Sequence, residues 1–245
     1  VYHAGLVGTD GAPLKEFLKE NGVDVSLIET AKVENGQAII QVDDSGQNSI
    51  FLFPGSNRAI TPIFAGNVLC YFEAEDYILL QNEISSLEEI IKTARERGMK
   101  IILNPSPFDE NLTGCDLSAV DTFLLNEVEG EAISGTSDPD KMAGAILEKY
   151  PKSHIVLTLG KRGVLYKDAN QSASHGIFDV PVVDTTAAGD TFTGYYIAGL
   201  LEGLPVEKTL RLASMASSIA VSREGAAPSI PTRDEVEQAL EKLGG

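Results

Sequence analysis

Short apolar runs alternate with helix-like segments along most of this chain. From residue 77 onward, the runs at 77–80, 100–103, 121–125 and 155–159 have the length of buried strands. Strands of this kind that alternate with helices predict a mainly parallel sheet with helices on both faces. The expected fold class is therefore α/β.

Helix-breaking and capping residues mark where the helices between these runs begin and end. Pro13 and Gly22 bound the first predicted helix. Ser85-Ser86-Leu87-Glu88 has the spacing of a capping box, which predicts a helix that ends at Gly98. Further helices are predicted to end near Gly135 and near Pro151, to span 206–221, and to close the chain at 232–243.

Two alternating segments in the first third of the chain predict a β-hairpin. Residues 37–42 and 48–53 are the strands, and Asp43-Asp44-Ser45-Gly46 provides the turn. The pattern alone is satisfied by a plain surface hairpin.

The strongest candidate for chemistry is the stretch 183–194, where small residues lead into an apolar helix. Ala187, Ala188 and Gly189 leave room at the helix N-terminus, where unpaired N–H groups and the positive end of the helix dipole favour an anion. Asp190 stands beside that anion site and could take a proton from a nucleophile that attacks phosphorus. The alternative is that Asp190 only caps the helix.

Other polar residues follow apolar runs, where the carboxyl ends of parallel strands bind ligands. They are Glu83, Asn104, Asn126, Glu129 and Thr158. Each has a structural alternative: a solvated loop for Glu83, a capping box for Asn126 and Glu129, and an ordinary turn for residues 158–163. The small residues of 206–221 permit either an adenine ring against the helix or close helix packing alone.

Composition and charge narrow the classes of function. The 245 residues are 43% hydrophobic, which suits a sizeable core, and the net charge of −17 argues against nucleic acid or an anionic membrane as partner. Neither a P-loop nor a Gly-x-Gly-x-x-Gly motif is present. Cys70 and Cys115 form no metal-ligand spacing, and no apolar run approaches the length of a membrane span, so a cytoplasmic location is expected.

The stretch around Asp190 resembles the C-terminal motif of the ribokinase-like (PfkB) family of carbohydrate and nucleoside kinases. Further matching stretches occur in order: Val7-Gly8-Thr9-Asp10, Pro54-Gly55-Ser56-Asn57, Leu80-Gln81-Asn82-Glu83, Asn104-Pro105-Ser106-Pro107, Asn126-Glu127-Val128-Glu129, Thr158-Leu159-Gly160-Lys161-Arg162-Gly163 and Gly225-Ala226-Ala227-Pro228-Ser229-Ile230-Pro231. The resemblance covers essentially the whole chain and is strongest to the ribokinases within the family.

The resemblance implies an enzyme that transfers the γ-phosphoryl group of MgATP to a primary hydroxyl of a furanose sugar, with D-ribose expected to give ribose 5-phosphate. It also implies Mg²⁺, K⁺ as an activator, and a homodimer. Two alternatives stay open. One is another kinase of the family, for fructose, 2-keto-3-deoxygluconate or a nucleoside, and the other is a sugar- or nucleotide-binding module without turnover.

Carried over residue by residue, the resemblance assigns Asp190 as catalytic base and substrate contact, and Ala187, Ala188 and Gly189 as the anion hole. Glu83 matches a sugar-binding residue. The nucleotide-binding positions are Asn126, Thr158, Gly160, Lys161, Gly163 and Ser214. Asn126 and Glu129 would hold Mg²⁺ through water, and the monovalent-cation positions are Asp184, Thr186, Ala220, Arg223, Gly225 and Ser229.

The resemblance also predicts how the chain is organised. Residues 1–245 would form a single ribokinase-like domain, in which 37–54 belong to a β-lid over the sugar. In the family, a further N-terminal portion with sugar-binding residues precedes the position of Val1. The sequence is therefore expected to be N-terminally incomplete.

Overall fold

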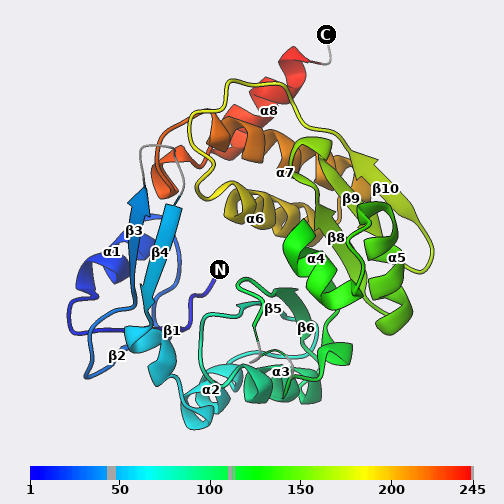
Figure 1. Cartoon of the computed structure of the whole chain (residues 1–245). Helices are drawn as coiled ribbons and strands as arrows, with labels where there is room; N and C mark the ends of the chain where they lie inside the picture. Colours follow the sequence, from blue (N-terminus) through cyan, green and yellow to red (C-terminus); the bar gives the residue numbers. More distant parts are fainter. Residues whose placement is uncertain (43–47, 110–111, 113, 244–245) are drawn as a thin grey trace. The chain divides into compact units, whose positions relative to one another are not determined.

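The structure is a computed structural model that describes residues 1–42, 48–109, 112 and 114–243 (Figure 1). The chain divides into two compact units, Val1–Val120 and Asp121–Gly245. The single domain expected for 1–245 stays a prediction. The predicted hairpin turn at Asp43-Asp44-Ser45-Gly46 lies outside the described residues.

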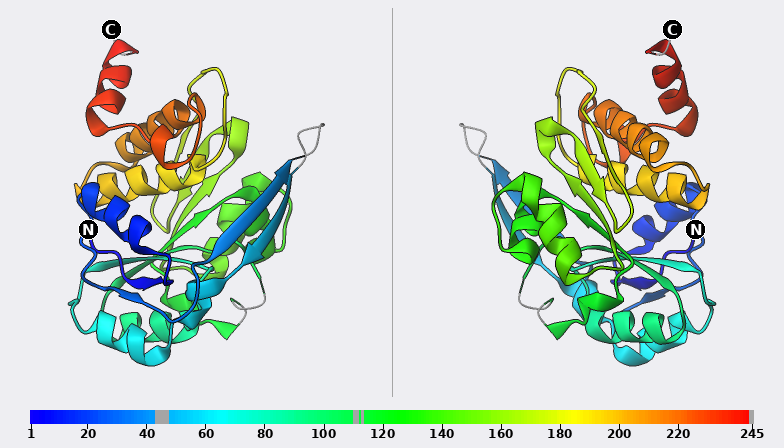
Figure 2. Two further views of the ribbon diagram at one scale, coloured as in Figure 1. Left: turned by 90° about the vertical axis from the view of Figure 1, so that its left-hand side faces the viewer. Right: turned by 90° about the vertical axis from the view of Figure 1, so that its right-hand side faces the viewer.

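The first unit begins with a small parallel pair and a hairpin. Strands β1 (Gly5–Val7) and β2 (Ile28–Thr30) pair in parallel around helix α1 (Ala12–Glu20). Strands β3 (Gln37–Val42) and β4 (Asn48–Phe53) then form a separate two-stranded antiparallel ribbon (Figure 2). The predicted helix and both predicted hairpin strands are confirmed, whereas the β1–β2 pair was not predicted.

The rest of this unit is a strand–helix–strand unit with short helices before it. The elements are η1 (Gly55–Ala59), α2 (Pro62–Leu69), β5 (Tyr77–Gln81), α3 (Leu87–Glu96), β6 (Lys100–Asn104) and η3 (Leu117–Ala119). Strand β5 pairs in parallel with β6. The side chains of Ile101, Ile102 and Leu103 are completely buried, as expected for a strand that is covered on both faces.

The capping box predicted at the start of α3 is wrong. The N-cap is Ser86, which has a φ of 62° and makes no side-chain capping bond. Instead the hydroxyls of Ser85 and Ser86 both donate to the carbonyl of Ile60, at 2.7 and 3.0 Å. The spacing predicted the helix correctly, but the N-cap is one residue later than the box requires, and both hydroxyls are oriented toward Ile60.

The second unit contains four strands in the order β10–β9–β8–β7. Strands β7 (Thr122–Leu125) and β8 (His154–Thr158) are parallel, and β9 (Val164–Lys167) and β10 (Ser172–His175) continue antiparallel. The helical elements are α4 (Glu127–Ser134), α5 (Pro139–Lys149), η4 (Gly160–Arg162), α6 (Ala188–Leu201), α7 (Val206–Val221), η5 (Ala227–Ser229) and α8 (Arg233–Lys242). Strand β10 was not predicted.

Helices cover both faces of these strands. All four residues of β7 are buried, which requires cover on either side. Helix α5 contacts β8 and β9, while α7 contacts β9 and β10. Helices α6 and α7 lie side by side (Figure 1), and Gly199 allows this because a β-carbon there would collide with Thr209. The packing places the first turn of α6 beside the middle of α7.

Candidate active site

A pocket of about 200 Å³ opens in the second unit, between the turn after β8, the start of α6 and the middle of α7. Its lining includes six residues that the sequence assigned to the nucleotide or the anion hole: Thr158, Gly160, Gly163, Ala188, Gly189 and Ser214. Ligand pockets commonly measure about 300–1,000 Å³, so this space suits one part of a nucleotide, such as its base.

The turn that forms one wall of the pocket depends on two glycines. Gly160 has a φ of 51° and Gly163 a φ of 86°, values that favour glycine. A β-carbon on Gly163 would also collide with the backbone of His175 and Gly176. The Leu159 N–H donates to the Gly163 carbonyl at 2.7 Å and closes the turn.

The two cations of this turn differ in their surroundings. Arg162 pairs with Glu127 at 3.1 Å and with Asp140 at 3.7 Å, so carboxylates already neutralise its guanidinium. Lys161 is exposed and takes part in none of the ion pairs of the described residues. Its ammonium is therefore the one in this turn that remains available for a phosphate.

The first turn of α6 has the geometry of an anion site. Ala187 is the N-cap, with a φ of 59° and no side-chain capping bond, so Asp190 is not the N-cap residue. Asp190 is exposed and lies at the third position of the helix. The Ala188 N–H turns back to the Thr185 carbonyl at 3.3 Å. The N–H of Gly189 belongs to the first turn, whose donors have no acceptor within the helix.

Asn126 and Glu129 form the capping box that their spacing predicted. Asn126 Oδ1 accepts the Glu129 N–H at 3.0 Å, and Glu129 Oε2 accepts the Asn126 N–H at 2.9 Å. Asn126 Nδ2 also donates to Glu129 Oε1 at 2.9 Å, and Glu129 is only 4% exposed. Because both carboxylate oxygens already accept hydrogen bonds, this pair fits Mg²⁺ through bound water rather than by direct ligation.

The proposed monovalent-cation residues come from two segments that hydrogen bonds join. The N–H groups of Val183 and Asp184 both donate to the Val221 carbonyl, at 2.8 and 3.2 Å. Asp184 Oδ1 accepts the Thr186 N–H at 2.9 Å, and its Oδ2 accepts the Gly225 N–H at 3.0 Å. The pKa of Asp184 is held below its ordinary value, mostly by the hydrogen bonds from Thr186 and to a smaller extent by the one from Gly225.

The other members of this set lie in the last turn of α7 and in the segment that follows it, which ends with η5. The Arg223 N–H donates to the Ala220 carbonyl at 3.1 Å, and Ser229 is completely buried with its hydroxyl on the Ala226 carbonyl at 2.7 Å. The donor set is one carboxylate and several backbone carbonyls. Carbonyl oxygens can replace the hydration shell of K⁺, so these residues fit such a cation.

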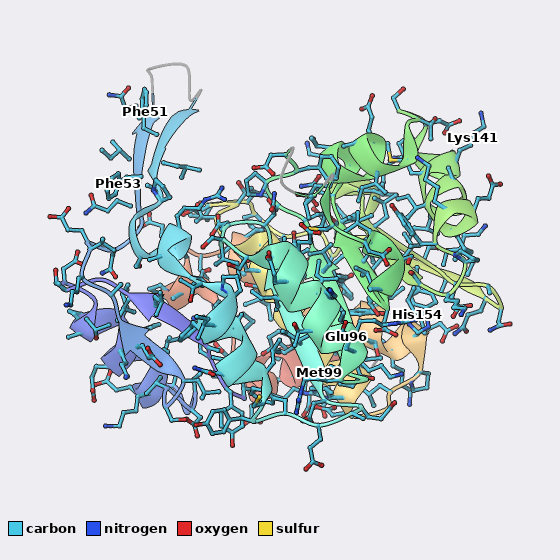
Figure 3. The ribbon with its side chains drawn as sticks, turned by 90° about the horizontal axis from the view of Figure 1, so that it is seen from below. Phe51, Phe53, Glu96, Met99, Lys141 and His154 are labelled. Atoms are coloured by element: carbon cyan, nitrogen blue, oxygen red, sulfur yellow. The ribbon has the colours of Figure 1, made fainter. Side chains whose placement is uncertain are left out.

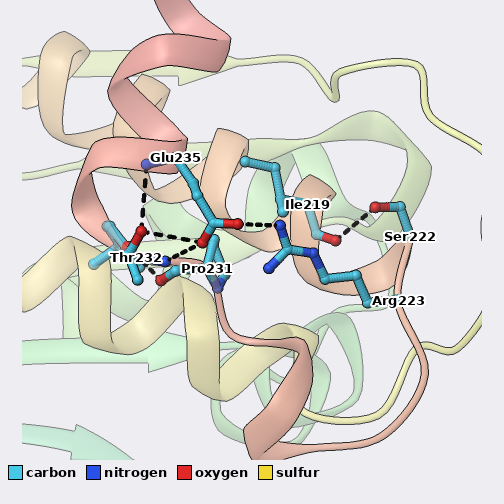
Figure 4. A network of polar contacts seen from close by, with 7 residues as sticks. Ile219, Ser222, Arg223, Pro231, Thr232 and Glu235 are labelled. Carbon is cyan, nitrogen blue, oxygen red and sulfur yellow. Dashed lines mark hydrogen bonds and ion pairs between the residues drawn. The ribbon is translucent and has the colours of Figure 1, made fainter.

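A polar network ties this segment to α8 (Figure 4). The guanidinium of Arg223 donates to Glu235 Oε1 at 2.6 Å, and Glu235 Oε2 accepts the Thr232 N–H at 2.7 Å. The hydrogen bond from Arg223 is the largest cause, and those from Thr232 the next, of a pKa of Glu235 lowered to about 2. The Tyr195 hydroxyl of α6 donates to the Pro231 carbonyl at 2.7 Å.

Glu83 belongs to the first unit and is the only assigned site residue that does. It is exposed and follows β5 by two residues. Its neighbour Asn82 is buried and donates from Nδ2 to the Pro107 carbonyl at 2.6 Å and to Asp109 at 2.7 Å. The segment that carries Glu83 is thereby fixed to the loop after β6, and its role toward a sugar stays a prediction.

Several pocket residues had not been assigned a role from the sequence: Val164, Ile177, Phe192, Ser217 and Ser218. The serines were recognisable because they share a face of α7 with Ser214 at helical spacing. Ile177 carried no such signal, since it follows a strand that the sequence pattern did not predict.

No group of three or more His, Cys, Asp or Glu side chains is placed to hold a metal ion among the described residues. None of the helices described is both long enough and apolar enough to cross a membrane.

The profile described as pfkB family carbohydrate kinase matches residues 1–233. Ribokinase of Bacillus subtilis (strain 168) is 35% identical over an alignment 245 residues long, which covers 98% of this chain and 81% of the relative. The crystal structure of ribokinase from Thermotoga maritima aligns with a TM-score of 0.83 and 32% identity, covering 98% of this chain and 81% of that one.

A second solved structure adds bound molecules to the comparison. Arabidopsis thaliana ribokinase complexed with ribose and ATP aligns with a TM-score of 0.82 and 27% identity, covering 98% of this chain and 81% of that one. These similarities confirm the α/β fold predicted from the sequence, with a mainly parallel sheet and a small antiparallel hairpin.

Proposed function

The chain belongs to the pfkB family of carbohydrate kinases, and we propose that it transfers the γ-phosphoryl group of ATP to the 5-hydroxyl of D-ribose. As a member of this family it is a phosphotransferase with an alcohol group as acceptor. The choice of ribose is supported by the relatives, which are named ribokinases at 35% and 32% identity.

The observation that carries the proposal is the position of the pocket. Its lining runs from the small residues of α7 to Ala188 and Gly189, and the latter directly precedes Asp190. Phe192 and Val164 give the pocket apolar walls, and Ser214 adds a hydroxyl. A nucleotide whose base occupies this space would have its phosphates within reach of the first turn of α6.

The chemistry follows from the groups in that turn. Asp190 takes the proton of the sugar hydroxyl as the oxygen attacks the γ-phosphorus. The N–H groups of Ala187 and Gly189 stabilise the charge that grows on the transferred phosphoryl group, and the N–H of Ala188 joins them by leaving the Thr185 carbonyl that it meets at 3.3 Å. Magnesium, held through water at Asn126 and Glu129, would neutralise the phosphates when bound, and the exposed ammonium of Lys161 adds positive charge at the turn.

We also propose a homodimer that forms through the β3–β4 hairpin. Ile39 faces Phe51 across the hairpin, and Phe53 lies on the same face as Phe51 (Figure 3). These three side chains are 60%, 60% and 54% exposed. An apolar face of this size on a two-stranded ribbon suits a second copy of the same hairpin, because isolated hairpins are marginally stable.

The experiment that tests the kinase proposal measures ADP formation with MgATP and a panel of ribose, deoxyribose, fructose, 2-keto-3-deoxygluconate and adenosine. We expect the highest kcat/KM on ribose. An Asp190→Asn variant should lose about 10²–10⁴ in kcat, because the base is removed while the shape is kept, and ATP binding should be largely unchanged.

The matched control is Asp234→Asn, which makes the same change at another exposed Asp in the first turn of a helix. It should leave kcat within about twofold of the wild type, as surface substitutions usually do. Near-normal turnover of Asp190→Asn would exclude Asp190 as the base, and a clear preference for another sugar of the panel would exclude ribose.

A further inference from the structure

Three ion pairs of the described residues involve helix α8, and two of them have the same length; the third joins Arg233 to Glu202 at 3.0 Å. Glu235 Oε1 lies 2.6 Å from the guanidinium of Arg223, in the turn after α7. Glu237 Oε1 lies 2.6 Å from Arg233 within α8 itself. Only the first pair joins the helix to the segment with the candidate cation ligands (Figure 4).

Glu235 is held in a fixed orientation by the start of its own helix. Its Oε2 accepts the N–H of Thr232 at 2.7 Å and the hydroxyl of Thr232 at 3.1 Å, while Oε1 is left to Arg223. The carbonyl of Pro231, the residue before Thr232, accepts a hydrogen bond from the Tyr195 hydroxyl of α6 at 2.7 Å. The carboxylate that meets Arg223 is therefore fixed to α8 and, through Pro231, to the helix that carries Asp190.

Arg223 lies in the middle of the candidate cation segment. Its N–H donates to the Ala220 carbonyl at 3.1 Å, and two residues later the Gly225 N–H donates to Asp184 Oδ2 at 3.0 Å. Three of the candidate ligands are the carbonyls of Ala220, Arg223 and Gly225. Fixing the Arg223 side chain restricts how the peptide groups between these two hydrogen bonds can rotate.

Charge gives the pair a second effect. A cation bound at the Arg223 carbonyl would lie on the same residue as a guanidinium, and like charges repel. Glu235 neutralises that guanidinium in a short, charge-assisted hydrogen bond. Without the carboxylate, the positive charge of Arg223 would oppose the binding of a second cation.

We propose that Glu235 is a positioning residue for monovalent-cation binding, acting through Arg223. It touches neither the cation nor the substrates. The inference rests on the proposed function in one respect, since K⁺ at Asp184 and the carbonyls of Ala220, Arg223 and Gly225 is what the family resemblance implies for such a kinase. A residue of α8 thereby sets the affinity of this site.

The test compares Glu235→Gln with the matched variant Glu237→Gln by titrating each with KCl at constant ionic strength, using tetramethylammonium chloride as the balancing salt. The first readout is the rise in Tm with K⁺, which requires no turnover, because a ligand that binds the folded state stabilises it by mass action. The second is the K⁺ concentration that half-saturates ADP formation with ribose. Both readouts report the affinity for the cation.

We expect Glu235→Gln to raise the half-saturating K⁺ concentration about fivefold, the factor that corresponds to the upper range for a partly exposed ion pair. Glu237→Gln should stay within about twofold of the wild type. A purely structural role for Glu235 would lower Tm equally at every K⁺ concentration and leave the half-saturating concentration unchanged, which would overturn the proposal.

Arg223→Lys provides a second variant if Glu235→Gln does not fold. It keeps the charge but loses the planar fork of the guanidinium, and a rise in the half-saturating K⁺ concentration is again expected. A wild-type protein that forms ADP with ribose but shows no K⁺ effect on Tm would overturn this inference while leaving the kinase proposal standing. Failure of the kinase proposal is seen separately, as the absence of sugar-dependent ADP formation.

Discussion

Replacing Gly163 with alanine should destabilise the second unit and damage the pocket. Gly163 has a φ of 86° and a ψ of −131°, a combination that side chains other than glycine rarely adopt. Such strained backbone conformations cost about 1–3 kcal/mol. The added β-carbon would also collide with the backbone of His175 and Gly176, which cannot move as freely as a flexible side chain. We therefore expect a loss of about 3 kcal/mol or more in the free energy of unfolding.

Thermal unfolding with and without MgATP measures this effect. For a chain of this length, 1 kcal/mol corresponds to a shift of about 2–4 °C in Tm, so Gly163→Ala should lower Tm by at least about 6 °C. The nucleotide should also stabilise the variant less than the wild type, because Gly163 lines the pocket.

The control is Gly144→Ala, which makes the same chemical change inside α5. A β-carbon there would meet no heavy atom within 4 Å, and alanine favours a helix over glycine by about 1 kcal/mol. This variant should therefore raise Tm by about 2–4 °C. If Gly163→Ala unfolded within about 2 °C of the wild type, the turn geometry would not require glycine and the reasoning would be refuted.

Two further predictions concern α8 and the hairpin. The pKa of Glu235 is lowered from 4.5 to about 2, so its contribution to stability is present above pH 4.5 and is lost as the pH falls toward 2. The Tm of the wild type should therefore fall more steeply between pH 4.5 and pH 2 than the Tm of Glu235→Gln. Equal slopes for the two proteins would contradict the assignment. Sedimentation equilibrium should give twice the chain mass of 26.1 kDa for the wild type and the single chain mass for Phe51→Asp, whereas a monomeric wild type would contradict the proposed dimer.

Local patterns in the sequence predicted most of the regular elements. The alternation of residues predicted both hairpin strands, and the stretch rich in small residues was predicted as the helix Val206–Val221, all at the bounds that the structure has. The capping spacings of Asn126–Glu129 and of Thr232 onward were followed by helices with those caps. These features depend on contacts between neighbours in the chain, which a sequence displays directly.

The predictions failed where a contact with a distant residue set the local structure. The Ser85 and Ser86 hydroxyls donate hydrogen bonds to the Ile60 carbonyl. The helix therefore starts without the capping box that the spacing suggested. Strand β10 (Ser172–His175) is short and polar, and it forms because it pairs with β9. Neither outcome has a local signal, since each depends on a partner elsewhere in the chain.

The sequence by itself determined the fold class, the family resemblance and the identity of the residues around Asp190, because these reside in residue types and their order. Tertiary structure decided which of those residues meet. It brought Thr158 and Gly163 of one turn together with Gly189 of α6 and Ser214 of α7 around one pocket. It also placed Glu235 against Arg223, a pairing twelve residues apart that no pattern indicated. Such contacts arise from the packing of whole elements, and the packing depends on the entire chain at once.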